Sequence, residues 1–509
     1  MSEASTEMSR KHRSVEDDIG YSHAKCPFHM STIYDLIVIG SGPAGESGAE
    51  EAARLGHSVA LIDDRSELGG NSCHTGTMPS KTLRESSLVL SHAVDHDFLP
   101  PVADHDEHPI TMSAFMYRAN QVMAKEAERV RSVMVRAGVS LFTGTARFTS
   151  AYTVIVSGGT EGAITLTGSH FLIACGSRPL RPIGVPFDGK QVFDSDDILN
   201  LSQLPKSLIV VGGGVIGSEY ATIFSNLGLR VQLIDANPVH LPFIDQEIVS
   251  VLHREIAKRS LTLELGTAVG NIALSGGQAV VTLADGRALR ADAVLYALGR
   301  ASNADGLDLA KAGVTADARN RITVDPEYRT CVPHIAAAGD AIGFPSLAAT
   351  SSDQGRSAVR ELFGLAGTDA QKLLPFGIYT IPEISTVGLS EVEARASSAT
   401  VVVGRCRLSE TARGIISGDD GLLKLIFDSG SRTLLGAHCI GARATDIIHT
   451  AMFCIRFHGT VDDLTEAVYN YPTVSDAIKI AALDALWQME VKSHHSYLAS
   501  RTPVMSPVI

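Results

Sequence analysis

The chain has 509 residues, which is too long for a single hydrophobic core, so two to four domains are expected. A hydrophobic fraction of 45% and 46 glycines are typical of a globular, turn-rich protein and exclude disordered and fibrous classes. The formal net charge of −13 argues against a nucleic-acid partner and against an anionic membrane surface. We find no run of about 18 uncharged apolar residues, so no membrane span is expected.

The cysteines are odd in number and scattered, without a CxxC pair. They are Cys26, Cys73, Cys175, Cys331, Cys406, Cys439 and Cys454. This pattern fits reduced thiols better than a disulfide framework, and a cytoplasmic location is expected from it.

The first 33 residues are polar and lack the apolar core of a secretory signal. His23, Cys26 and His29 could ligate a metal, but three ligands in such a segment are a weak signal. A flexible N-terminal extension over 1–33 is the favoured interpretation, and no metal site is predicted.

Residues 34–40, YDLIVIG, have the pattern of a buried strand and lead into a segment with helical spacing. Gly40, Gly42 and Gly45 form a GxGxxG motif between them. In such a motif the first glycine permits a tight turn, the second lets a pyrophosphate approach the backbone, and the third lets helix and strand pack closely. The N–H groups at the helix start then face the phosphates. The next strand ends in Asp63, where a carboxylate can accept a hydrogen bond from a ribose hydroxyl. These features together predict a bound dinucleotide; a glycine turn without a ligand is the alternative.

The same pattern returns in residues 207–235. Gly212, Gly214 and Gly217 form the second motif, and Asp235 closes the next strand. In both copies the acid follows the first glycine at the same spacing, 40 to 63 and 212 to 235. Two such fingerprints predict two dinucleotides bound at once, and therefore electron or hydride transfer between a flavin and a nicotinamide.

Further motifs connect the chain to a known family. The segments that carry the resemblance are LIACGSRP (172–179), YALGR (296–300), IAAAGDAIGFPSLAATSSDQGR (335–356) and PFGIYTIPEISTVGLSEVEA (375–394). With the two fingerprints they make residues 34–490 resemble the two-dinucleotide-binding flavoprotein disulfide reductases, a dihydrolipoamide dehydrogenase-like family. Within that family, GTMPSK (76–81) and YNYPTVSDA (469–477) resemble the soluble pyridine nucleotide transhydrogenases.

The resemblance implies an α/β fold with two Rossmann-type dinucleotide-binding domains, one inserted in the other, and a C-terminal α+β dimerisation domain. The expected limits are 34–181 and 300–370 for the FAD-binding domain, 182–299 for the NAD(P)-binding domain, 371–490 for the dimerisation domain and 491–509 for a C-terminal tail. It also implies FAD as cofactor, NAD(H) and NADP(H) as substrates, and a homodimer. Beyond the fingerprints, the cofactor-binding positions that it implies are Gly70, Lys81, Gly176, Gly299 and Asp340, the last on the ribityl chain.

Thiol-active members of the family carry two cysteines five residues apart and, near the C-terminus, a histidine followed five residues later by an acid. This chain has Ser72 and Thr77 in the cysteine positions and Tyr471 in the histidine position. Serine and threonine hydroxyls have pKa values far too high for thiolate chemistry, and tyrosine cannot replace imidazole near neutral pH. Cys73 is turned by roughly 100° from Ser72 on a helix, so we expect it to face elsewhere as an inert thiol. Disulfide reduction is therefore disfavoured.

The residues that the resemblance connects with hydride transfer are retained in this chain. Lys81 resembles the lysine at the flavin N5 edge, where a cation would stabilise the negative charge of the reduced ring. Its expected ion-pair partner is Glu219, and Thr77 is expected beneath the isoalloxazine. These three residues are the predicted catalytic set. His74 matches the transhydrogenase pattern, and its roles as a plain helix residue and as a proton carrier are both open.

The segment after the second fingerprint strand, IDANPVHLP (234–242), contains Asp235 and no basic residue. An aspartate favours the ribose diol of NAD and repels the 2′-phosphate of NADP. Unless Arg230 or a distant cation reaches over, NADP is expected to bind poorly.

These observations predict a flavin-dependent NAD(P) transhydrogenase that works by a ping-pong route without a redox disulfide. The alternative is an NADH diaphorase or quinone reductase of the same fold. A flavin-binding subunit without turnover, and a disulfide reductase using Cys73, are less favoured.

Overall fold

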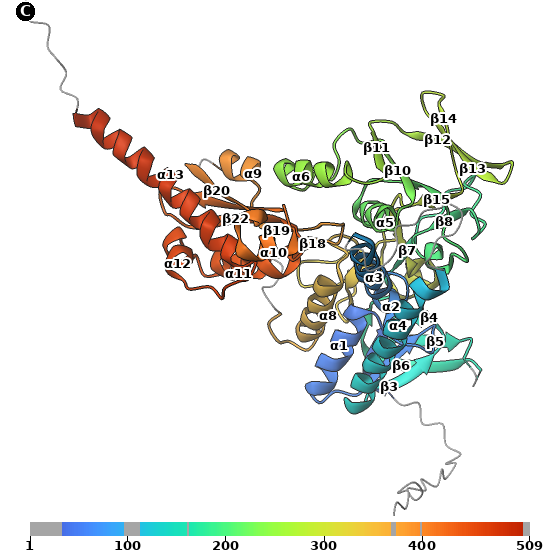
Figure 1. The fold of residues 1–509 in the computed structure, drawn as a ribbon. Helices are drawn as coiled ribbons and strands as arrows, with labels where there is room; N and C mark the ends of the chain where they lie inside the picture. The colour runs from blue at the N-terminus through green and yellow to red at the C-terminus, as the bar shows by residue number, and fades with distance from the viewer. Residues whose placement is uncertain (1–32, 96–111, 160–161, 368–372, 398–399, 502–509) are drawn as a thin grey trace, which may run out of the picture. The chain divides into compact units, whose positions relative to one another are not determined.

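The computed structural model describes residues 33–95, 112–159, 162–367, 373–397 and 400–501 (Figure 1). His23, Cys26 and His29 of the N-terminal segment lie outside the described residues. No helix in these ranges has the length and apolar character needed to cross a membrane.

The first sheet is built around strand β1 (Ile33–Ile39), which pairs in parallel with a strand on each side. Leu36, Ile37 and Val38 are fully buried, as in a central parallel strand that is covered on both faces. The sheet runs in the order β3 (Ser140–Thr143), β2 (Val59–Asp63), β1, β6 (Ile164–Ile173), β5 (Thr153–Ser157) and β4 (Thr145–Ser150). Strand β17 (Ile335–Ala337) pairs with β6, so the sheet combines segments from both sides of an inserted region.

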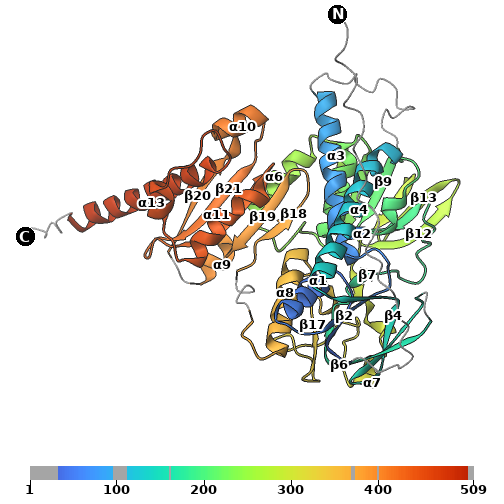
Figure 2. The same ribbon diagram turned by 90° about the horizontal axis from the view of Figure 1, so that it is seen from below.

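Helix α1 (Pro43–Arg54) leaves β1 and packs against α8 (Ala348–Leu362), far away in sequence (Figures 1 and 2). Gly355 of α8 permits this close crossing, because a Cβ atom there would lie 2.0 Å from the carbonyl oxygen of Ala44. The other α-helices described in this part are α2 (Gly70–His74), α3 (Thr77–Asp95), α4 (Met112–Arg136) and α7 (Leu309–Ala312).

The inserted region has its own parallel sheet. Its order is β11 (Leu261–Leu265), β10 (Arg230–Asp235), β9 (Ser207–Val211), β15 (Ala293–Tyr296) and β8 (Val192–Asp194). Helices α5 (Val215–Asn226) and α6 (Gln246–Ile256) accompany it, with a three-stranded antiparallel sheet formed by β12 (Val269–Ser275), β13 (Gln278–Leu283) and β14 (Ala288–Ala291). The chain enters and leaves the region side by side, because β7 (Ser177–Pro179) pairs antiparallel with β16 (Arg300–Ser302).

The C-terminal part is an antiparallel sheet with helices. Its strands run in the order β18 (Phe376–Ile378), β19 (Glu383–Gly388), β22 (Leu434–Gly441), β21 (Leu422–Asp428) and β20 (Val401–Arg407). The helices are α9 (Glu391–Ala396), α10 (Ala412–Ser417), α11 (Ala444–Arg456), α12 (Val461–Glu466) and α13 (Asp476–Arg501). Helix α13 packs along β20 (Figure 2). The predicted fold class, two Rossmann-type α/β units, one inserted in the other, with a C-terminal α+β unit, is confirmed. Each main sheet falls within one predicted domain, whose limits stay a prediction.

Candidate functional site

The two glycine motifs fold alike in backbone detail. The Gly40 amide donates to the carbonyl of Ile62 at 2.8 Å, and the Gly212 amide donates to the carbonyl of Ile234 at 2.8 Å. A Cβ atom on Gly45 would lie 1.8 Å from the carbonyl oxygen of Gly40, so only glycine lets this helix lie so close to its strand. Gly217 repeats the 1.8 Å approach to Gly212. Gly45 and Gly217 therefore have the packing role that the third glycine of the motif predicts.

The acids that close the fingerprints hold their own loops. Asp63 accepts hydrogen bonds from the backbone amides of Ser41 at 2.7 Å and Arg65 at 3.0 Å. Asp235 accepts from the amides of Gly213 at 2.5 Å and Asn237 at 2.7 Å. A carboxylate has about four acceptor positions, so each acid can still accept from a ribose hydroxyl while bracing the turn. The sequence indicated the ribose role alone.

A main cavity of about 820 Å³ lies beside the first fingerprint, within the usual range for ligand pockets. Nine of the predicted site residues line it: Gly40, Gly42, Asp63, Gly70, Thr77, Lys81, Gly176, Glu219 and Asp340. The others stand outside its lining: Gly45, Gly212, Gly214, Gly217, Asp235 and Gly299. Val215 and Ile216, at the start of α5, bring the second fingerprint to the edge of this cavity.

The cavity wall fits a dinucleotide near the first glycine motif. Helix α1 begins after Gly42 without a side-chain cap, so its first amides are available to an anion. Gly70 lies back to back with Gly42, because a Cβ atom there would be 2.8 Å from the Gly42 Cα atom. This bare backbone cradle, joined to a long cavity, suits the pyrophosphate of a flavin dinucleotide.

Lys81 and Glu219 meet at the cavity from different parts of the chain. The Lys81 Nζ atom is 2.6 Å from Glu219 Oε2, with side-chain exposures of 27% and 6%. The other Glu219 oxygen, Oε1, accepts from the backbone amide of Tyr379 at 2.9 Å, and Lys81 Nζ lies 4.9 Å from the Tyr379 ring centroid. The predicted ion pair is present, and Tyr379 completes it with a backbone donor and an aromatic face.

A second polar network stands where the chain crosses into and out of the inserted region. The Ser177 hydroxyl donates to Asp340 Oδ2 at 2.7 Å and accepts from Arg300 Nε at 2.8 Å. Arg300 also donates to the Ser177 carbonyl at 2.8 Å. The orientation of Asp340 therefore depends on Ser177 and Arg300, which sequence reasoning did not single out. Arg300 is part of YALGR, so that motif was the available signal.

Ser72 and Cys73 point in different directions, as expected. Ser72 lines the main cavity, whereas Cys73 is buried and its Sγ atom lies 3.3 Å from the carbonyl oxygen of Met123. Burial raises the pKa of the Cys73 thiol to about 11, so it holds little thiolate at neutral pH. All six cysteines within the described ranges are free, and no group of three or more His, Cys, Asp and Glu side chains there could hold a metal ion.

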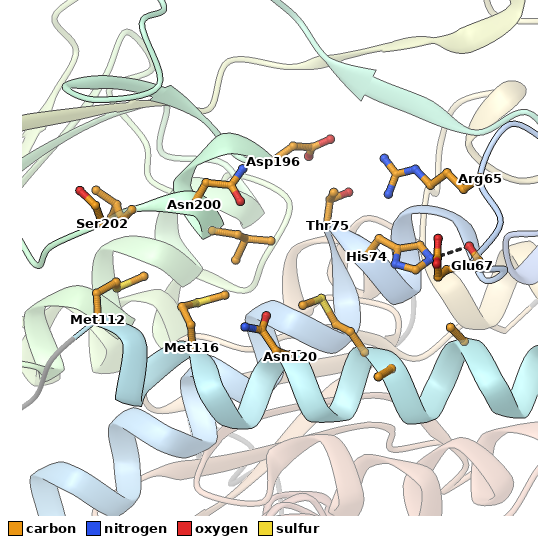
Figure 3. Close-up of a pocket in the computed structure, with 15 residues that line it drawn as sticks. Arg65, Glu67, His74, Thr75, Met112, Met116, Asn120, Asp196, Asn200 and Ser202 are labelled. Atoms are coloured by element: carbon orange, nitrogen blue, oxygen red, sulfur yellow. Dashed lines mark hydrogen bonds between the residues drawn. The ribbon is translucent and has the colours of Figure 1, made fainter.

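A side pocket of about 680 Å³ adjoins the main cavity and shares Arg65, Thr75 and Asp196 with it. Figure 3 shows Met112, Met116 and Asn120 along one helix, α4, facing Asn200 and Ser202 across the pocket. His74 lines this side pocket, and its Nε2 atom lies 2.8 Å from the carbonyl oxygen of Glu67. Since a carbonyl only accepts, Nε2 carries a proton. His74 thus faces away from the main cavity.

The C-terminal YNYPTVSDA segment is not part of the main cavity of its own chain. Tyr471 is 75% exposed, and Asp476 begins α13. Helix α11 does contribute, because Thr445, Ile448 and His449 line the cavity.

Comparisons with known proteins agree with this geometry. Residues 34–355 match the family described as pyridine nucleotide-disulphide oxidoreductase, and residues 374–482 match the dimerisation domain of that family. A soluble pyridine nucleotide transhydrogenase of Mycobacterium tuberculosis is 42% identical over 458 residues, covering 90% of this chain and 98% of the relative. One of Pseudomonas putida is 37% identical, covering 89% and 98%.

Solved structures show the same fold. The flavoprotein disulfide reductase RclA from Escherichia coli matches with a TM-score of 0.80 and 26% identity, covering 88% of this chain and 99% of that chain. LpdA from Mycobacterium tuberculosis matches with a TM-score of 0.81 and 25% identity, with the same coverage. Taken with the matches over both family regions, these similarities show that the chain belongs to the pyridine nucleotide-disulphide oxidoreductase family and, within it, to the soluble pyridine nucleotide transhydrogenases.

Proposed function

We propose that the protein is an FAD-dependent transhydrogenase that moves hydride between NADPH/NADP and NADH/NAD by a ping-pong route. Bound FAD supplies the hydride-accepting and hydride-donating centre at N5. The chain needs one nicotinamide site for this, used first by the reduced and then by the oxidised nucleotide. The relatives in Mycobacterium tuberculosis and Pseudomonas putida that carry the transhydrogenase name support the proposal.

The observation that carries the proposal is the Lys81–Glu219 pair in a cavity at which the described residues place no pair of thiols. A fixed ammonium group at the cavity wall would stabilise negative charge on the reduced ring. Glu219 holds that group in place and is itself fixed by the Tyr379 amide. Thr77 lines the same wall and offers a hydroxyl where a thiol relay would need sulfur. Hydride can thus enter and leave without a disulfide.

Both pyridine nucleotides must be accepted for this reaction, and Asp235 makes NADP the weaker substrate. Its carboxylate is fixed beside the second glycine loop by two backbone amides. Arg230 lies at the opposite end of β10, five residues before Asp235, and so is not positioned to neutralise it. Another cation of the inserted region, Arg287, is already held in ion pairs with Glu264 and Asp285. We propose a preference for NAD(H), with NADP(H) accepted at lower affinity.

We further propose a homodimer, formed through the C-terminal part that matches the family's dimerisation domain. Large apolar side chains are exposed there in this single chain, among them Phe457, Val468 and Tyr471. Such a concentration of exposed apolar groups indicates an interface. A cytoplasmic location remains part of the proposal.

Flavin reduction and reoxidation test the function directly. Purified holoenzyme is reduced anaerobically with NADPH or with NADH, and a thionicotinamide analogue of NAD is then added. The flavin band should bleach and then return as the reduced analogue forms. The Lys81→Met variant should slow both steps by about 10²-fold, the usual cost of one electrostatic group at a reacting centre. Cys73→Ser should leave both steps unchanged.

The second candidate is an NADH diaphorase or quinone reductase, which Asp235 favours because NAD(H) alone would suffice. The same experiment separates the two functions. If NADPH fails to bleach the flavin while NADH with a quinone turns over, the transhydrogenase proposal is wrong. Loss of hydride transfer in the Cys73→Ser variant would instead support a mechanism that uses the Cys73 thiol.

A further inference from the structure

A buried pair of histidines lies behind the second glycine loop. His240 follows β10 and is only 3% exposed, and His253 is on helix α6. The His240 Nδ1 and His253 Nε2 atoms are 3.0 Å apart, with the rings stacked at a 13° interplanar angle. On its other side, His240 Nε2 is 2.8 Å from the hydroxyl of Ser218 on α5. Both nitrogens of a buried imidazole are therefore engaged.

His253, His240 and Ser218 form a chain of hydrogen bonds that ends at the Gly213 carbonyl, and this acceptor fixes the direction of the bonds. The Ser218 hydroxyl is 3.2 Å from the carbonyl oxygen of Gly213, which can only accept, so Ser218 donates to it. The Ser218 oxygen then accepts from Nε2–H of His240. Neutral His240 is left with a lone pair on Nδ1, and this accepts from Nε2–H of His253. The chain of donors runs from His253 through His240 and Ser218 to the Gly213 carbonyl.

Gly213 is the middle residue of the second glycine motif, and both of its backbone polar groups are held. Its amide donates to Asp235 and its carbonyl accepts from Ser218. The amide belongs to the Gly212–Gly213 peptide unit and the carbonyl to the Gly213–Gly214 unit, so each of the two units is held by one hydrogen bond. The orientation of the turn between Gly212 and Gly214 is therefore set from two directions, by an acid at the end of β10 and by the histidine chain. The Asp63 carboxylate of the first fingerprint braces its loop in the same way, but Ser41 there uses its hydroxyl to accept from the Gly69 amide.

We propose that His240 is a positioning residue for the nicotinamide nucleotide, acting through Ser218 to hold the phosphate-binding turn in its binding conformation. This rests on the proposed function only in assigning the second glycine loop to a nicotinamide nucleotide. Neither His240 nor Ser218 lines the main cavity, so both act at a distance from the transferred hydride. The expected effect is on nucleotide affinity and not on the chemical step.

The surroundings of His240 keep the chain of donors neutral. From α6 it meets His253, from β10 it meets the charge of Asp235, and from α5 it meets the neutral Ser218 hydroxyl. Burial lowers the pKa of His240 to about 4, and it lowers the pKa of His253 as well. A single added proton on Nδ1 of His240 would place its N–H against the Nε2–H of His253, which would break the hydrogen bond between the two rings. The turn should thus be held across the neutral range and released at acid pH.

Titration of oxidised holoenzyme with NAD⁺, followed by calorimetry, tests the proposal without any hydride transfer. Loss of one hydrogen bond worth about 1 kcal/mol weakens binding about fivefold, so His240→Leu and Ser218→Ala should each raise the Kd for NAD⁺ by about that factor. His240→Gln should bind within about twofold of the wild type, because its Nε2 amide can donate to Ser218. The double variant Ser218→Ala/His240→Leu should be no weaker than either single variant, because both changes break one chain.

The controls separate this role from simple packing. Ser225→Ala removes another buried serine from α5, one that bonds to the Thr222 carbonyl away from the loop, and should leave the Kd unchanged. FAD content should be the same in all variants. If His240→Leu binds NAD⁺ as the wild type does, or if His240→Gln is as weak as His240→Leu, the proposal is wrong. Wild-type enzyme that binds NAD⁺ but passes no hydride to the thionicotinamide analogue would contradict only the proposed function.

Discussion

The Asp235 carboxylate braces the second glycine loop, and we propose that it also selects the nucleotide, so nucleotide preference can be tested at this single residue. Asp235→Asn removes a negative charge from the position of a 2′-phosphate, and its side-chain oxygen can still accept from the Gly213 amide. Charge repulsion near a protein surface is worth about 1–2 kcal/mol, so the NADPH-to-NADH ratio of kcat/KM for flavin reduction should rise about tenfold. An unchanged ratio would mean that another group selects the nucleotide.

Asp63→Asn, the equivalent change in the first fingerprint, is the matched control for that variant. It should lower the retention of FAD, because Asp63 lines the main cavity and a neutral amide oxygen accepts more weakly from a ribose hydroxyl than a carboxylate does. In the protein that retains FAD, it should leave the NADPH-to-NADH ratio unchanged.

Residue spacing predicted part of this site well. Two glycine motifs with acids at equal distances indicated two dinucleotide loops, and in the structure both loops share the bond from the first glycine to the neighbouring strand and the bond to the closing acid. Lys81 and Glu219 were paired through resemblance, and they do meet. Tyr379 and Arg300 were not predicted, because their contacts join residues about 160 and 120 positions apart, and no local pattern records such a contact. Asp63 and Asp235 can hold their loops only because each glycine turn folds back toward the end of the next strand. The sequence motif alone does not predict that conformation.

Among the secondary elements, α5 and α6 are joined through the histidine pair, and this contact makes their stability depend on pH. The unfolded chain has a histidine pKa near 6.5, whereas His240 in the folded protein titrates at about 4. Below pH 6.5 the unfolded state binds a proton that the folded state does not. The free energy of unfolding therefore falls as the pH drops from about 6.5 to 4, by about 2 kcal/mol at pH 5 for His240 alone.

Thermal denaturation of holoenzyme at pH 7.5 and pH 5 measures this contribution. His240→Gln should lose less thermal stability than the wild type between the two pH values, by a few degrees in Tm. His334→Gln, a change of the same kind in the FAD-binding part, should show the full wild-type loss. An equal pH-dependent loss in His240→Gln and in the wild type would place the titrating group elsewhere.

Helix α2 shows the limit of sequence reasoning at this scale. The rotation expected between Ser72 and Cys73 assumes a helix at these residues, and the structure has a short helix, Gly70–His74, a break at Thr75 and Gly76, and a second helix from Thr77. The separate directions of Ser72 and Cys73 follow from helical rotation within α2. The position of Thr77 instead follows from the break, since it is the first residue of α3. Residue periodicity predicts helices but does not predict the break between them.

Over the whole molecule, buried charge connects the inserted region to the C-terminal part. Lys424 on β21 is 2% exposed and lies 2.8 Å from Asp245, which caps α6. It also lies 3.0 Å from Glu247 and 2.7 Å from Glu391. The side-chain hydrogen bonds of Arg405 and Lys424 lower the pKa of Glu247 to about 2. The family resemblance implied three domains, but the sequence offered no means to predict that one lysine neutralises acids from two of them.

Removal of Lys424 should lower the free energy of unfolding far more than removal of a surface cation. Lys424→Met leaves Asp245 buried without its positive partner, which typically costs about 3–5 kcal/mol, and should lower Tm markedly at neutral pH. Lys258→Met removes a cation from the exposed ion pair with Glu255 at the end of α6, worth at most about 1 kcal/mol, and should change Tm little. The difference in Tm between Lys424→Met and the wild type should be smaller at acid pH. Protonation there neutralises carboxylates that are unpaired only in the variant. Equal Tm values for the two lysine variants would show that the Lys424 cluster does not stabilise the contact between the two parts.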